Sequence, residues 1–172
     1  MPNTKAVGVA FSDPELTSGT TITGATIDST SRVLSNIPAG LTASQQGATI
    51  ATTGNSDVFV IAPAAGTLTS AVFSGTDALA TSNTNYITFS ITNLGQAGAG
   101  TAAMLAATDA NTTKATGGTA LSANTVRSLT LNGTAANLVV AAGDRIRIRA
   151  AATGTLANTV TFPVYRLNFT VT

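Results

Sequence analysis

Carboxylates are the first candidates for chemistry in this sequence, because it contains no histidine and no cysteine. Catalytic triads built on those two residues are therefore excluded, as are thiolate metal sites. A glycosidase needs two carboxylates that flank one bond, but the acidic residues are isolated or beside turns, and their spacing indicates no pair. They are Asp13, Glu15, Asp28, Asp57, Asp77, Asp109 and Asp144. The sequence predicts no catalytic residue and no enzyme.

One short segment begins like a calcium-binding loop. Asp109-Ala110-Asn111 supplies the first oxygen ligands, but the glycine and the bidentate glutamate that such a loop requires are missing, and Lys114 lies where negative charge is needed. An Asx-type turn is the better interpretation. The glycines 95, 98 and 100 do not open a helix after a strand, so they do not indicate a phosphate site. We expect neither a metal nor a cofactor.

Three arginines alternate with apolar residues in the segment RIRIR, residues 145–149. The period of two places Arg145, Arg147 and Arg149 on one face of a strand, about 7 Å apart, with Ile146 and Ile148 on the other face. Two interpretations remain open. The arginines are either a solvated outer face or a row that pairs with carboxylates of a partner protein, where bidentate geometry suits an interface. Nucleic acid is less favoured because no stacking aromatic residues accompany the row.

The composition points to a single folded domain with little charge. The chain has 172 residues, of which 44% are hydrophobic and only 9% are charged, far below the usual quarter. Its net charge of +1 gives no attraction to nucleic acid or to an anionic membrane. A surface of this kind suits burial against copies or partners, but it equally suits a plain β-domain. No run approaches the ~20 apolar residues of a membrane helix. The N-terminus lacks the apolar core of a Sec signal, so we expect the product to stay in the cytoplasm or to leave by another route.

The first 56 residues are the least regular part. Weak strands are expected over residues 6–11, 20–27 and 46–52, and an extended arm is the competing interpretation. We expect a mixture, with residues 1–16 as an N-terminal arm that packs on a neighbouring subunit. Residues 17–172 then form a single β-sandwich domain, best defined over residues 57–172. The apolar side chains expected to make the arm's contact are Val7, Val9, Phe11 and Leu16.

From residue 57 onwards the chain reads as short strands separated by turns. Pro63 ends the first strand, which alternates apolar residues on both faces and is expected to be buried on both. Asn132-Gly133 is a strong hairpin signal, and Pro163 indicates an edge position or a bulge. Residues 102–110 fit a strand or a single helical turn. Further strands are expected over 57–62, 66–73, 85–92, 121–131, 138–140, from 145 onwards, and 160–171.

The turn at Ala142-Gly143-Asp144 separates the apolar run Leu138–Val140 from the arginine strand. This order predicts two strands that are joined, or sharply bent, at Gly143. About eight to ten short strands with almost no helical pattern predict an all-β fold, an antiparallel β-sandwich. No repeat of fixed period is present, which argues against propellers and solenoids.

Four segments carry a resemblance to a known class of protein. Residues 57–73 (DVFVIAPAAGTLTSAVF), 85–93 (NYITFSITN), 121–131 (LSANTVRSLTL) and 139–156 (VVAAGDRIRIRAAATGTL) resemble small tailed-bacteriophage virion proteins of the capsid decoration or cement type. The AGD turn before an alternating strand is also similar to trimeric jelly rolls of the complement-C1q and tumour-necrosis-factor type. The resemblance spans roughly residues 57–172.

This resemblance implies a jelly-roll sandwich that forms a homotrimer on the virion head, made in the host bacterial cytoplasm. Its partners would be the major capsid protein and its own copies, with neighbouring capsid subunits locked together. The alternative is a binding module of a virion fibre or appendage that recognises a host glycan or protein. A freestanding lectin-like domain is a third interpretation. Exposed aromatic platforms would favour the binding module, but tryptophan is absent, and Tyr86 and Tyr165 both fall inside expected strands.

Overall fold

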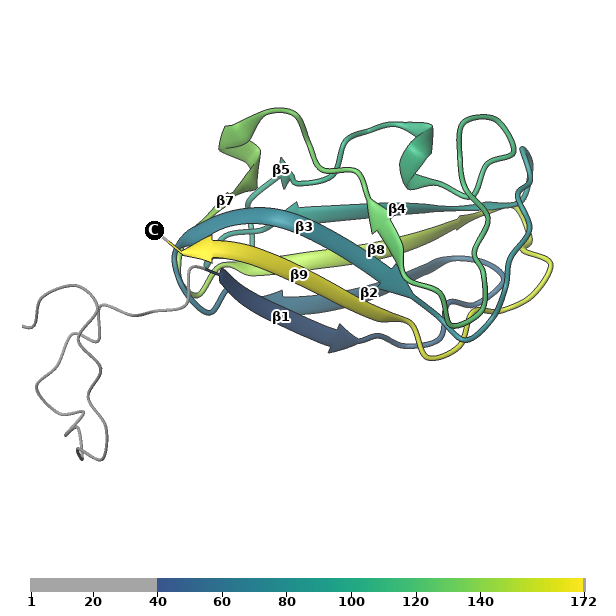
Figure 1. Cartoon of the computed structure of the whole chain (residues 1–172), viewed down its shortest axis with the longest axis horizontal. Coiled ribbons are helices and arrows are strands. Elements are labelled where there is room, and N and C mark those ends of the chain that lie inside the picture. Colours follow the sequence, from purple (N-terminus) through teal and green to yellow (C-terminus); the bar gives the residue numbers. More distant parts are fainter. Residues whose placement is uncertain (1–39, 172) are drawn as a thin grey trace, which may run out of the picture. The chain divides into compact units, whose positions relative to one another are not determined.

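Two antiparallel sheets face each other in this protein (Figure 1). The computed structural model describes residues 40–171. The first sheet has the order β1-β9-β3-β6, with β7 also paired to β3, and the second has the order β2-β8-β4-β5. The strands are β1 Gly40–Gln46, β2 Asn55–Ile61, β3 Gly66–Ser74, β4 Tyr86–Asn93, β5 Ala102–Ala103, β6 Arg127–Leu129, β7 Val139–Val140, β8 Arg145–Thr153 and β9 Val164–Val171. Two single-turn 3-10 helices accompany them, η2 Asp109–Asn111 and η3 Ala135–Leu138.

The strand pairing is nested. The first strand pairs with the last (β1 with β9), the second with the next to last (β2 with β8), β3 with β6 and β7, and β4 with β5. A long hairpin wrapped into two facing sheets produces this pattern, which is that of a jelly roll. The predicted all-β antiparallel sandwich is confirmed, and its topology is jelly-roll-like. The predicted arm and the domain boundary at residue 17 lie outside the described residues.

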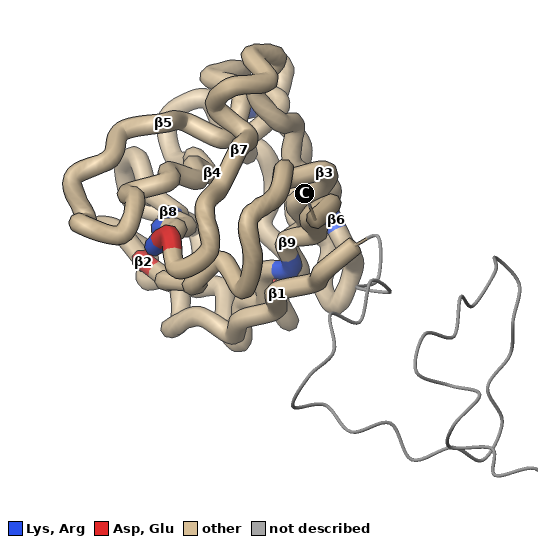
Figure 2. The backbone as a smooth tube through the Cα atoms, turned by 90° about the vertical axis from the view of Figure 1, so that its left-hand side faces the viewer, with Lys and Arg blue, Asp and Glu red and all other residues tan. Residues whose placement is uncertain are grey.

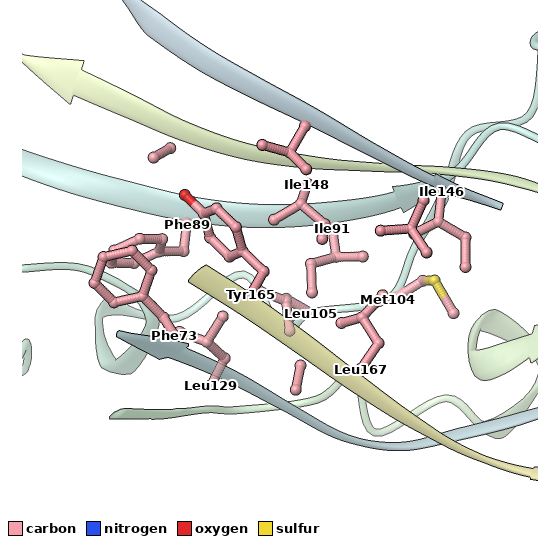
Figure 3. Packing of buried hydrophobic residues seen from close by; sticks show 14 of the residues in the cluster. Phe73, Phe89, Ile91, Met104, Leu105, Leu129, Ile146, Ile148, Tyr165 and Leu167 are labelled. Atoms are coloured by element: carbon pink, nitrogen blue, oxygen red, sulfur yellow. The ribbon is translucent and has the colours of Figure 1, made fainter. Parts of the chain in front are cut away.

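Alternation along the strands builds the core between the sheets. On β4, Ile87, Phe89 and Ile91 are buried, as the period of two predicts, and β8 and β9 follow the same rule. Figure 3 shows side chains of both sheets directed into one interior. The ring of Phe73 on β3 lies 4.8 Å from that of Phe89 on β4, so an aromatic contact joins the two sheets. It also lies 5.3 Å from the ring of Tyr165 on the neighbouring strand β9. Burial raises the pKa of Tyr165.

The chain crosses from one sheet to the other at Gly143. This residue has φ +83°, a conformation that glycine adopts without strain, and it separates β7 in the first sheet from β8 in the second. The predicted break between two strands is confirmed here. At this break the chain passes from the first sheet to the second.

Other expectations need correction. Phe59 and Ile61 on β2 are 41% and 59% exposed, so this strand is buried on one face only. The reason is that its sheet has a single packed face, whereas burial on both faces requires covering layers on both sides. Pro163 directly precedes β9, which pairs on both sides and is not an edge strand. A proline just outside a strand removes no ladder hydrogen bond.

Asn132-Gly133 does not form the predicted hairpin. Leu131 bridges Leu105, whereas β7 pairs with β3, so the two flanking segments have different partners. The Asn132 side chain instead closes a local turn, because its oxygen accepts a hydrogen bond from the Thr134 amide at 2.8 Å. The segment 102–110 contains both expected forms, the short strand β5 and the beginning of η2.

The outer face of the β1-β9-β3 sheet is largely uncharged. Asn168 on β9 accepts a hydrogen bond from the Thr42 hydroxyl at 2.8 Å and donates one to the Ser70 hydroxyl at 2.6 Å. These bonds link β1, β9 and β3, and they give these polar side chains hydrogen-bond partners within the sheet. Within residues 40–171, no helix has the length and apolar character needed to cross a membrane.

Candidate interaction surface

The outer face of the second sheet carries the arginine row. Strands β2 and β8 pair antiparallel, with Asp57 opposite Arg149, Phe59 opposite Arg147 and Ile61 opposite Arg145. Figure 2 shows that charged residues are sparse along the described chain and that basic and acidic residues lie close together at β2 and β8. This face therefore concentrates charged and apolar side chains on a protein that has few charges.

Arg149 is neutralised within the sheet. Its Nε and one terminal nitrogen donate to the two oxygens of Asp57, each at 2.6 Å. A fork of this kind matches the carboxylate in plane and is among the stronger ion pairs. The hydrogen bond from Arg149 is the main cause of the lowered pKa of Asp57. The predicted row of three arginines is thus divided, because Arg149 already has its carboxylate.

Arg145 and Phe59 form the second part of this face. The Arg145 guanidinium lies over the Phe59 ring, 4.1 Å from its centroid, in a cation–π arrangement. Ile61, directly opposite Arg145, is the more exposed of the two apolar residues. Exposed apolar side chains grouped beside cations on a sheet face are typical of protein–protein contact surfaces.

Arg147 is the least satisfied side chain of the face. Its Nε is buried and has no hydrogen-bond partner among residues 40–171. A buried donor without a partner is destabilising for the folded chain. We call Phe59, Ile61, Arg145 and Arg147 the β2–β8 patch.

Replacing Asp57 by asparagine tests the internal ion pair. At pH 7 the variant should lose about 1 kcal/mol of unfolding free energy, because the charge-assisted fork to Arg149 is weakened. Since the pKa of Asp57 is lowered in the folded state, its contribution is present above the unfolded pKa near 3.8 and disappears as the pH falls through the folded value. The stability difference between wild type and variant should therefore close between about pH 5 and pH 2. Urea titrations at several pH values measure it. A difference that persists at the lowest pH would contradict this assignment.

The remaining described carboxylates serve the fold. Asp77 accepts hydrogen bonds from the Thr161 amide at 2.7 Å and from the Thr161 hydroxyl, which lower its pKa. Asp109 forms an ion pair with Lys114 at 2.8 Å. In the part of the chain that the structure describes, no three acidic side chains gather as a metal site would require.

Two structural residues have no recognisable signal in the sequence. Arg127 on β6 donates to the main-chain oxygens of Ala110, Thr112 and Thr119 at 2.7–3.0 Å, and burial lowers its pKa. The buried Asn111 bonds to main-chain atoms of residues 106 and 130, with each distance 2.8 Å. Both side chains fix the loops that lie beside β4 and β6. Their partners are distant or irregular main-chain atoms, which no local spacing encodes.

A hollow of about 330 Å³ lies along β4, between that strand and residues 103–114. Hydroxyls of Thr88, Ser90 and Thr92 line it together with the Asp109–Lys114 pair. No aromatic platform of the kind that sugars stack on belongs to its lining apart from Phe89, whose side chain is buried in the core. The hollow thus offers less for recognition than the β2–β8 patch.

Comparison of the chain with protein-family models, with curated proteins and with solved structures finds no match.

Proposed function

We propose that this chain is a structural virion protein that decorates a tailed-phage capsid, stabilising the head by bridging neighbouring capsid subunits as a homotrimer. The observation that carries the proposal is the β2–β8 patch, a sheet face with exposed Phe59 and Ile61 beside two arginines that have no carboxylate partner among the described residues. Aromatic residues and arginine are enriched at the centres of protein interfaces. The jelly-roll topology agrees with the resemblance to decoration proteins.

The proposed mechanism is non-covalent bridging. Each copy buries apolar and polar area against the shell, and three linked copies raise the effective concentration of every contact once the first has formed. Release then requires several contacts to break together. A protein that works in this way needs a rigid scaffold and an adhesive face, and it needs no catalytic group.

The N-terminal arm remains part of the proposal. Its apolar residues Val7, Val9, Phe11 and Leu16 lie outside the described residues, so the argument for them is their sequence pattern alone. We propose that they reach a neighbouring subunit, as arms with few internal contacts do.

Co-sedimentation tests the proposal. The full chain is mixed with emptied heads of the phage whose genome encodes it, stripped of their surface proteins, and is centrifuged over a range of concentrations. We expect saturable binding, and light scattering should give a mass near three times 17.0 kDa. Deleting residues 2–16 should weaken binding while the circular dichroism of the domain is unchanged. Unchanged occupancy after the deletion would contradict the role of the arm. If wild-type protein stayed in the supernatant but bound isolated tail fibres or host cells, the appendage module would replace decoration.

A further inference from the structure

We infer that the β2–β8 patch is a carboxylate-binding site for an extended acidic segment of the major capsid protein, with side-chain carboxylates at alternate positions and an apolar residue beside them. This inference rests on the proposed function and adds the contact face and the chemistry of the partner. Three observations support it: two cations without an ion-pair partner in residues 40–171, the spacing of their side chains, and apolar exposure at the sheet edge.

Arg145 and Arg147 have no ion-pair partner within residues 40–171. Of the carboxylates in residues 40–171, Asp57 pairs with Arg149, Asp109 pairs with Lys114, and Asp77 and Asp144 are hydrogen-bonded elsewhere. None forms an ion pair with Arg145 or Arg147. The hydrogen bond from Arg149 is the largest cause of the lowered pKa of Asp57, and the charge of Arg147 also contributes to it. Two neighbouring guanidinium groups repel each other, and a partner carboxylate offsets that repulsion.

The spacing defines the ligand. Arg145 and Arg147 are two residues apart on β8 and point to the same side of the sheet, so their stems are about 7 Å apart. Carboxylates at alternate positions of an extended segment have the same spacing. The Arg145 guanidinium lies over Phe59, which occupies its face and leaves its N–H edge free for a bidentate bond to a carboxylate. The two parallel N–H groups of the guanidinium match the two oxygens of a carboxylate, whereas a carbonyl offers only one oxygen.

The position in the fold gives the partner access. β2 is the outermost strand of its sheet, and Ile61 lies at its end, 59% exposed, next to Arg145 in the register. A partner segment that binds the arginines therefore meets Ile61 and Phe59 at the rim, where an apolar side chain can exclude water from the ion pairs. Nucleic acid fits less well, because Asp57 interrupts the cationic row after two arginines.

The test compares matched variants of the full chain on emptied, stripped heads. Arg145→Gln/Arg147→Gln should weaken binding by about tenfold or more, because the partner carboxylates are left without their cations. The control is Arg166→Gln, which removes one exposed charge from the outer face of β9 and should bind as wild type does. Raising the salt concentration should weaken wild-type binding and have much less effect on the double variant.

The possible results distinguish a failure of the proposed carboxylate site from a failure of the proposed function. If wild-type protein binds and the double variant binds equally well, the carboxylate site is wrong while decoration stands. If wild-type protein does not bind heads at all, the proposed function fails first. Arg145→Lys/Arg147→Lys keeps the charge but loses the fork, so its affinity should fall between those of the other two proteins; it also serves as the test variant if the glutamine form is unfolded by circular dichroism.

The alternative occupant is the acidic N-terminal segment of the chain itself, which contains Asp13 and Glu15. Combining the deletion of residues 2–16 with the double arginine variant decides this. Additive losses in binding free energy are expected for independent contacts. A combined loss no greater than the larger single loss would assign the patch to the N-terminal segment and overturn the inference.

Discussion

Replacing Gly66 by alanine should destabilise the protein by about 3 kcal/mol or more, or prevent it from folding. Gly66 is the first residue of β3, and a Cβ atom there would lie 2.1 Å from the main-chain oxygen of Thr170 and 3.1 Å from its carbon. Because the obstacle is backbone, no side-chain rotation relieves it. The end of β9 would have to move away from β3, which breaks the terminal pairs of this ladder, Gly66 with Val171 and Thr67 with Thr170.

Thermal unfolding measures this effect. A loss of 3 kcal/mol corresponds to a midpoint lower by roughly 6 to 12 °C in a domain of this size. Gly133→Ala is the matched control, because a Cβ atom at residue 133 would have no neighbouring atom within 4 Å, and it should leave the midpoint unchanged or slightly raised. A Gly66→Ala protein as stable as the control would show that β3 and β9 approach less closely than described.

Replacing Asp144 by alanine should cost about 2 to 3 kcal/mol of unfolding free energy. The carboxylate is buried, and its Oδ2 accepts hydrogen bonds from the Ala141 amide at 2.9 Å and the Asn93 side chain at 2.8 Å. Alanine would leave both donors without this acceptor, at the point where the chain passes from β7 to β8. Because β8 lies between β2 and β4, the whole second sheet depends on this turn.

Replacing Asp144 by asparagine separates the contribution of the hydrogen bonds from that of the negative charge. Both bonds use the same oxygen of Asp144, so asparagine can accept them with its amide oxygen and should cost only about 1 kcal/mol. Urea unfolding of both variants at neutral pH gives the two free energies. Equal losses for alanine and asparagine would mean that the negative charge, and not the pair of hydrogen bonds, holds the turn.

The alternating segments are where sequence reasoning succeeds. Ile87, Phe89 and Ile91 face the core, and Ile146 and Ile148 are buried opposite the arginines, because a period of two translates directly into two faces of a strand. The Gly143 turn is equally predictable, since few residues other than glycine adopt its backbone conformation. Local pattern is sufficient for the fold class.

Pairing between segments distant in sequence is not predictable in this way. β1 (Gly40–Gln46) pairs with β9 at the other end of the chain, and its sequence GLTASQQ has too few apolar residues to stand out, so the pattern predicts a strand over 46–52 in its place. The exposure of Phe59 depends on which layers cover β2, a property of the assembled sandwich.

The arginine row shows both what the sequence pattern predicts and what it does not predict. Its single-face placement follows from the alternation of Arg145, Arg147 and Arg149. Its division does not, because Asp57 lies 92 residues from Arg149 and meets it only through the β2–β8 register. Pairing within the sheet neutralises Arg149 through Asp57. Arg145 and Arg147 form no ion pair with any carboxylate in residues 40–171. That difference is what narrows the candidate surface to the β2–β8 patch.

We propose that the protein binds the outside of a capsid, and an electron cryo-microscopy reconstruction of emptied, stripped heads incubated with the full chain tests this binding. We expect ordered additional density at regular positions on the outer surface, in trimers, with the β2–β8 face of each sandwich directed at the shell. Heads without added density at saturating protein concentration would contradict it.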